Sequence, residues 1–218
     1  MEIEFVEAHF KGKIELPEKF IKALPQKIGL FTTVQYINQI QNIKMQIEGK
    51  GKTVTLFKTR HSEHSGQLLG CSIQEFSGVD AFVYIGDGLF HPRALVIKNN
   101  LPVHIYNPLS EKTSLIDKKD VEKILKKQKG AYMKFLSAKN IGVLVSTKPG
   151  QNRYKDSKKL EKKYPDKEFF YLVFDTIEFS GLENFVFIDC FVNTACPRIG
   201  LDDTINLEKP VVNVDEIL

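Results

Sequence analysis

The feature that most constrains the fold is a series of short apolar runs, rich in β-branched and aromatic residues and closed by turn or polar residues. Such runs are typical of buried parallel strands. The expected strands are Ile28–Thr33, Thr53–Phe57, Ala81–Ile85, Val103–Tyr106, Ile141–Ser146, Phe169–Phe174, Phe185–Ile188 and Pro210–Val214. Helical patterns lie between many of them, at Val34–Glu48, Asp120–Gln128 and Tyr154–Lys163. This alternation predicts an α/β fold with mostly parallel sheets, flanking helices and right-handed crossovers.

The two halves of the chain resemble each other. Ile28–Thr33 is similar to Ile141–Ser146, and Phe82–Asp87 is similar to Phe185–Asp189. The segment Phe82–Asp87 is followed by His91-Pro-Arg, and the segment Phe185–Asp189 is followed by Cys196-Pro-Arg. We therefore predict two duplicated small domains, residues 1–115 with an N-terminal arm and residues 116–218. In open α/β sheets ligands bind at the carboxyl ends of the strands, so we expect a site at those ends, in a cleft between the domains.

Composition narrows the class of protein. Hydrophobic residues make up 42% and charged residues 27% of the chain, which is ordinary for a globular protein. No apolar run approaches the length of about 18 residues that spans a membrane, and Met1–Phe5 lacks the basic start of a signal peptide. Three cysteines are too few for a disulfide scaffold. We expect a cytoplasmic protein with reduced thiols and no membrane partner.

Two of the cysteines occupy loops suited to metal binding. Cys71 follows Gly70, and Cys196 lies between Ala195 and Pro197. Thiolates at such positions favour zinc, copper(I) or an iron–sulfur cluster, and the alternative is a pair of buried, inert thiols. Cys190 and Cys196 form a C-x5-C pair that does not complete a structural zinc site. His91, after Gly86-Asp87-Gly88, is the histidine best placed for function, at an expected strand-end loop.

Two groups of lysines are interleaved with apolar residues at helical spacing, within 118–129 and 155–167. They are typical of solvated helix faces. The functional alternative is a basic surface for an acidic partner, or a zinc or RNA-binding module. No basic–aromatic recognition motif supports a direct nucleic-acid contact.

Four segments carry a resemblance to a known family. They are Gly66-Gln-Leu-Leu-Gly-Cys71, Asp80-Ala-Phe-Val-Tyr-Ile-Gly-Asp-Gly-Leu-Phe-His91, Ser146-Thr-Lys-Pro-Gly-Gln151 and Asn193-Thr-Ala-Cys-Pro-Arg198. In order and spacing, from about residue 25 to about residue 205, they resemble the archaeal type of diphthamide synthase. These enzymes are non-standard radical S-adenosylmethionine 3-amino-3-carboxypropyl transferases, which begin diphthamide formation on translation elongation factor 2.

The resemblance implies a [4Fe–4S] cluster with one cysteine from each of several small α/β domains. Cys71 and Cys196 would be two of the ligands. Cleavage of S-adenosylmethionine would yield a 3-amino-3-carboxypropyl radical that adds to a histidine of the elongation factor. The residues expected to bind the cosubstrate are Gln35, Asp87, His91, Thr147, Gly150 and Gln151. No catalytic side chain is assigned. We also expect an electron donor as a partner. The chain is expected to form a dimer, with a second copy of itself or with a longer relative.

One departure from the family pattern leaves alternatives open. Relatives generally carry the first cluster cysteine in a preceding domain, which we expect this sequence to lack. The third ligand would then be Cys190, a group other than cysteine, or a residue of a partner chain. A non-catalytic or accessory subunit, which recruits the elongation factor or supports a full-length relative, is the alternative to an active enzyme.

Overall fold

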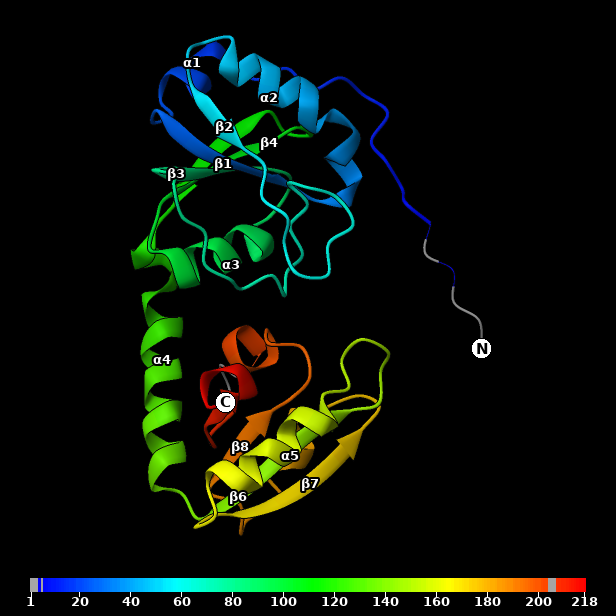
Figure 1. Ribbon diagram of the computed structural model, residues 1–218, viewed down its shortest axis with the longest axis vertical. Coiled ribbons are helices and arrows are strands. Elements are labelled where there is room, and N and C mark those ends of the chain that lie inside the picture. The colour runs from blue at the N-terminus through cyan, green and yellow to red at the C-terminus, as the bar shows by residue number, and fades with distance from the viewer. Residues whose placement is uncertain (1–3, 5, 204–206) are drawn as a thin grey trace. The chain divides into compact units, whose positions relative to one another are not determined.

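The computed structural model describes residue 4, residues 6–203 and residues 207–218. The chain divides into two compact units, Met1–Val121 and Glu122–Leu218. Each unit contains its own sheet, built mostly from parallel strands (Figure 1). Among the described residues, none of the helices combines the length and the apolar character that crossing a bilayer requires.

The first unit contains a five-stranded sheet in the order β2-β1-β3-β4-β5. All its strand pairs are parallel except β4 with β5. Its elements are α1 (Glu18–Lys22), β1 (Lys27–Thr32), a 3-10 helix (Val34–Gln39), α2 (Ile40–Glu48), β2 (Thr53–Thr55), β3 (Ala81–Ile85), α3 (Phe90–Asn99), β4 (Val103–Asn107) and β5 (Lys112–Ile116).

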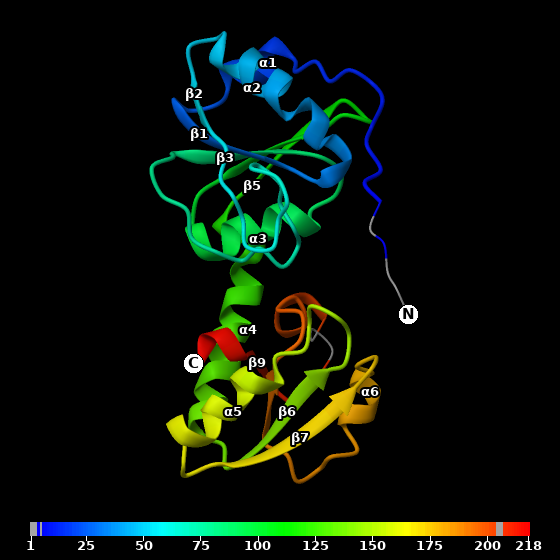
Figure 2. The same cartoon turned by 45° about the vertical axis from the view of Figure 1, so that its right-hand side comes forward.

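Both faces of this first sheet are covered at its centre, which explains why the central strand β3 is apolar and buried along its whole length. Helices α1 and α2 lie on one side and α3 lies on the other, in both views of the ribbon (Figures 1 and 2). On the α2 side, Ile28 and Leu30 of β1 pack with the isoleucines of the helix. On the other side, Phe31 and Phe82 belong to a cluster of phenylalanine rings.

The second unit contains a four-stranded, fully parallel sheet in the order β7-β6-β8-β9. Helix α4 (Lys118–Ser137) spans the boundary between the units. The elements that follow are β6 (Asn140–Ser146), α5 (Tyr154–Lys163), β7 (Glu168–Phe174), α6 (Phe179–Leu182), β8 (Cys190–Asn193), a π-helix (Ile199–Asp203), β9 (Val211–Asn213) and a 3-10 helix (Val214–Glu216). Helices α4 and α5 cover one sheet face, and α6 and its flanking segments cover the other.

The expected strands are confirmed with one exception. Phe185–Ile188 is not a strand, and the strand of this region is Cys190–Asn193. The earlier run is apolar because Phe185 and Ile188 pack on the side of the sheet that α6 covers. The sequence reading also missed α1, α3, β5 and α6, and it made α4 too short.

The register of the strands gives a better alignment of the two units than the sequence did. Ile28 of β1 pairs with Ala81, and Ile141 of β6 pairs with Cys190. The residue before each pair's second member is an aspartate, Asp80 or Asp189. Cys196 follows Asp189 at the same distance along the chain as Asp87 follows Asp80. Cys196 therefore corresponds to Asp87, and not to His91 as the sequence comparison suggested. The misplaced strand caused that error.

Candidate functional site

In the first unit, Cys71 lies in the long segment between β2 and β3, residues 56–80, which we call the Cys71 loop. This loop is attached to the carboxyl end of β1. The backbone N–H of Thr32 donates to the Gly66 carbonyl at 2.8 Å, and the N–H of Leu68 donates to the Thr32 carbonyl at 2.8 Å. Gly66 has a positive φ of 82°, and a Cβ there would lie 2.2 Å from Ile40. A glycine is therefore required for the loop to approach the sheet this closely.

Buried polar side chains fix the same loop from within. The Thr59 hydroxyl donates to the Gln67 carbonyl at 3.0 Å, and the Ser72 hydroxyl donates to Thr59 Oγ1 at 3.1 Å. The side-chain oxygen of Gln67 accepts from the N–H groups of Glu63 and His64. Sequence reasoning did not single out Thr59 or Ser72, because neither lies in a recognisable motif. Together they hold the backbone beside Cys71, whose side chain is exposed.

Other predicted site residues of this unit gather at the start of α3. The Phe90 ring lies so close to Gly70 that a Cβ on this glycine would be 2.0 Å from it. The Cys71 loop therefore touches the first turn of α3. His91 lies in this helix, and not in a loop as predicted, with its ring stacked on Tyr84 at 6.0 Å between centroids.

Asp87 lies in the turn between β3 and α3, with its side chain exposed. Its Oδ1 accepts from Asn107 Nδ2 at 2.7 Å and from the Gly88 N–H at 2.8 Å. Two buried tyrosine hydroxyls lie below this turn, on Tyr36 and Tyr84, and neither has a hydrogen-bond partner within the described residues. Burial raises the pKa of Tyr84, and Asp87 contributes to the same effect. Asp87 is thus held in place while its side chain stays exposed.

Gln35 follows β1 and lies apart from these contacts. Its side chain is exposed, and its backbone carbonyl accepts from the Phe10 N–H at 2.6 Å. With Ala8, His9, Phe10 and Lys11 it lines an open hollow of about 550 Å³ beside the N-terminal arm. The structure therefore brings Cys71 and His91 to the same end of α3, and it places Gln35 against the arm.

In the second unit, the loop after β6 contains Thr147, Gly150 and Gln151. Thr147 Oγ1 donates to Asp175 at 3.2 Å, and the Gln151 N–H donates to the Lys148 carbonyl at 3.1 Å. Gly150 has a φ of 76°, a conformation that favours glycine. These residues are near the surface, with Thr147 and Gly150 exposed.

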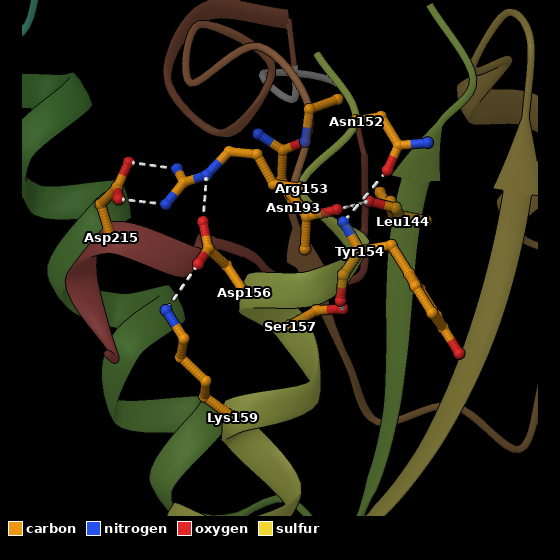
Figure 3. Close-up of polar contacts among 11 residues, drawn as sticks. Leu144, Asn152, Arg153, Tyr154, Asp156, Ser157, Lys159, Asn193 and Asp215 are labelled. Carbon is orange, nitrogen blue, oxygen red and sulfur yellow. Dashed lines mark hydrogen bonds and ion pairs between the residues drawn. The ribbon is translucent and has the colours of Figure 1, made fainter. Parts of the chain in front are cut away.

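Arg153 secures the far end of this loop (Figure 3). Its two terminal nitrogens donate to the Asp215 carboxylate at 2.7 and 2.8 Å, and its Nε donates to Asp156 at 3.2 Å. The hydrogen bond to Asp215 is the main cause of a raised pKa for Arg153. The loop after β6 is therefore tied to the segment after β9, which the sequence did not reveal because the two are far apart along the chain.

The second predicted ligand, Cys196, lies three residues beyond the carboxyl end of β8 and is partly exposed. Cys190 differs in every respect. It begins β8, at the opposite end of the strand, and its side chain is fully buried in the core under α4 and α5. Burial raises the pKa of the Cys190 thiol to about 12. Of the third ligands that the sequence left open, Cys190 therefore lies away from the strand-end loops, in the core of the second unit.

The described residues contain no group of three or more histidine, cysteine, aspartate or glutamate side chains that could hold a metal ion. The donor chemistry of two thiols nevertheless fits an iron–sulfur group. Cys71 and Cys196 are soft ligands, each is accessible, and each lies on a loop with a fixed backbone.

Comparisons with known proteins identify relatives of this chain. The family described as "Putative diphthamide synthesis protein" matches residues 2–218. The 2-(3-amino-3-carboxypropyl)histidine synthase of Pyrococcus horikoshii is 33% identical over 202 residues, which are 90% of this chain and 58% of the relative. The enzyme of the same description from Methanocaldococcus jannaschii is 32% identical, over 88% of this chain and 51% of the relative. This chain therefore spans little more than half the length of these relatives.

Solved structures show the same likeness. The crystal structure of Dph2 from Pyrococcus horikoshii matches with a TM-score of 0.76 and 32% identity, over 90% of this chain and 57% of the solved one. A second structure of that protein, described as containing a 4Fe-4S cluster, matches with the same TM-score and identity. From the match over residues 2–218 and the likeness to these relatives, this chain belongs to the diphthamide synthesis protein family.

Proposed function

We propose that this chain takes part in the first step of diphthamide formation. The reaction is iron–sulfur-dependent cleavage of S-adenosylmethionine, with transfer of the 3-amino-3-carboxypropyl group to a histidine of translation elongation factor 2. The observation that carries the proposal is the environment of the two motif cysteines. Cys71 and Cys196 are accessible thiols on anchored strand-end loops, in a chain whose relatives are 2-(3-amino-3-carboxypropyl)histidine synthases.

In this proposal, Cys71 and Cys196 would hold a [4Fe–4S] cluster through their thiolates. When bound, the cluster supplies the electron that opens the Cγ–S bond of S-adenosylmethionine, and the protein positions the reactants. The third cysteine of the chain is buried at the wrong end of its strand. We therefore assign the third ligand to a group other than Cys190, in this chain or in a partner.

The exposed polar groups at the strand ends suit the cosubstrate. An ionised Asp87 can accept hydrogen bonds from the ribose hydroxyls or from the ammonium group of S-adenosylmethionine. The Thr147 hydroxyl and the backbone around Gly150 can donate to its carboxylate. His91 and Gln151 lie beside these groups in sequence, and Gln35 would make a contact from beside the N-terminal arm.

Reconstitution with iron and sulfide without oxygen tests the ligands. We expect the wild-type chain to retain iron and to show the electron paramagnetic resonance signal of a reduced cluster, and we expect Cys71→Ala and Cys196→Ala to lose it. Each substitution removes a thiolate, and neither side chain belongs to the cores of the units. Iron content and spectra are measured beside circular dichroism, which reports whether each variant is folded.

Reduction of the reconstituted protein with S-adenosylmethionine tests the reaction. The expected product is methylthioadenosine. When elongation factor 2 is added, we also expect it to carry the 3-amino-3-carboxypropyl group. An intact cluster that gives no methylthioadenosine would contradict the proposal.

An accessory role is the second candidate, and the burial of Cys190 favours it. With that thiol in the core, this chain has two accessible cysteines to offer a cluster. Such a chain would recruit the elongation factor or support a full-length relative. Copurification with a longer relative, together with no iron retention by this chain alone, would favour this role. Complete modification of the elongation factor by this chain alone would exclude it.

A further inference from the structure

The loop that carries Cys196 is held by an asparagine with nearly no exposure. Asn193, the last residue of β8, is 1% exposed. Its Nδ2 donates to the Cys196 carbonyl at 2.9 Å, and its Oδ1 accepts from the Ala195 N–H at 3.0 Å. One side-chain amide therefore fixes the backbone on Cys196 itself and on the residue before it.

A second buried asparagine completes the arrangement from the neighbouring strand. Asn213, the last residue of β9, is 5% exposed and pairs with Asn193 in the parallel register. Its Oδ1 accepts from Asn193 Nδ2 at 2.7 Å, and its Nδ2 donates to the Pro197 carbonyl at 2.9 Å. Together the two amides bind backbone groups of Ala195, Cys196 and Pro197.

Further contacts attach the loop to the sheet and to the following helix. The Thr194 hydroxyl and backbone N–H both donate to the Leu144 carbonyl of β6, at 2.8 and 3.1 Å. On the other side, Gly200 lies against Asn213, and a Cβ there would be 2.5 Å from Asn213 Oδ1. Asn213 is therefore held between the Cys196 loop and the backbone of Gly200.

A side-chain amide satisfies both requirements of these positions. Each asparagine donates and accepts at once, whereas an ionised aspartate only accepts and would be a buried charge facing other oxygens. Burying two polar groups in a parallel sheet costs free energy unless every hydrogen bond is made. Apolar residues would fill the same positions without this cost, so their polarity must serve the loop.

We propose that Asn193 and Asn213 are positioning residues, which fix the Cys196 backbone so that its thiol is aimed as a cluster ligand. The inference rests on the proposed role of Cys196. With the backbone of residues 195–197 fixed, the direction of the thiol depends on the side-chain torsion of Cys196 alone. Groups that orient a metal ligand in this way commonly contribute about 10- to 100-fold to metal affinity.

Asn213→Asp is the variant that tests this role, because it keeps the shape and the acceptor but loses the donor to Pro197. Asn140→Ala is the matched control. Asn140 Nδ2 also donates to a backbone carbonyl of the second unit, that of Phe187 at 3.0 Å, but at the opposite end of β6 from the Cys196 loop. These two variants, the wild type and Cys196→Ala are all reconstituted. Iron loss to a chelator is then followed over time, and the electron paramagnetic resonance spectrum of the reduced cluster is recorded for each protein.

We expect Asn213→Asp to lose iron about 10- to 100-fold faster than the wild type and to show shifted g values, with Asn140→Ala unchanged. Circular dichroism and the melting temperature show whether the variant is folded. If Asn213→Asp does not fold, Gly200→Ala decides, because its methyl group displaces the Asn213 amide without removing it.

The outcomes separate the two proposals. A wild-type chain that retains no more iron than Cys196→Ala contradicts the proposed function and this inference with it. A cluster that depends on Cys196, but that Asn213→Asp or a folded Gly200→Ala holds with the wild-type lifetime and spectrum, overturns the inference alone.

Discussion

At the scale of single residues, the three cysteines separate by environment. Cys71 and Cys196 lie in loops whose backbones are fixed by hydrogen bonds from buried side chains, and their thiols are accessible. Cys190 packs in the core of the second unit beside residues such as Val192 and Leu160. A thiol in such surroundings acts as a small hydrophobic group, and its raised pKa keeps it protonated at neutral pH.

We therefore expect Cys190→Ala to behave as a core substitution. It should lower the free energy of unfolding by roughly 1 kcal/mol, since it leaves a small cavity. Urea denaturation measures this change. Iron retention after reconstitution should equal that of the wild type, and a loss as large as that of Cys196→Ala would instead identify Cys190 as a ligand.

At the scale of the elements, an aspartate directly precedes one central strand of each sheet, Asp80 before β3 and Asp189 before β8. Asp80 Oδ2 accepts from the Lys27 N–H at 3.0 Å, at the start of β1. Asp189 Oδ2 accepts from the N–H groups of Asn140 and Lys139, at 2.9 and 3.1 Å, at the start of β6. In both units the carboxylate satisfies backbone donors that precede the first hydrogen bonds of the ladder.

These bonds make the stability of the second unit depend on pH. The backbone N–H groups of Asn140 and Lys139 lower the pKa of Asp189 in the folded state. A lowered pKa stabilises the fold above the unfolded-state value, near pH 4, and the contribution is lost as the pH falls through the folded value.

We expect Asp189→Asn to reduce this dependence, because its amide oxygen still accepts a hydrogen bond and does not titrate. Melting temperatures measured by circular dichroism from pH 7 to pH 3 should fall less steeply below pH 4 than in the wild type. Glu183→Gln, an exposed acid of the same unit, is the control. Equal slopes for Asp189→Asn and the wild type would contradict the assignment.

At the scale of the whole molecule, each unit has its own core. The cluster around Ile43 contains residues of the first unit, and the cluster around Phe135 contains residues of the second. Both side chains have 0% exposure. A chain built in this way has two sources of cooperativity, and its unfolding need not be a single transition.

We expect calorimetry to resolve two transitions, each sensitive to one core. Phe135→Ala should lower the free energy of unfolding of the second unit by about 3–5 kcal/mol and leave the other transition in place, because the lost ring packs on Tyr164 at 5.0 Å between centroids. Ile43→Ala should affect the first unit in the same way, by about 2–5 kcal/mol. One transition that both variants lower equally would contradict this independence.

The sequence by itself determined the class of fold and the family. Short apolar runs such as Ala81–Ile85 identify buried parallel strands, since strands covered on both faces need no polar alternation. The motifs around Cys71 and Cys196 also identified the family, because they depend only on local residue order.

Only the tertiary structure decided which residues share an environment. Phe185–Ile188 and Cys190–Asn193 are both apolar, and hydrogen bonding to β6 makes only the second a strand. That register placed Cys190 in the core and aligned Cys196 with Asp87. It also brought Asn213 beside Asn193, and Asp215 lies close enough to bind Arg153. Such pairs lie far apart along the chain, and local patterns carry no information about contacts that packing alone creates.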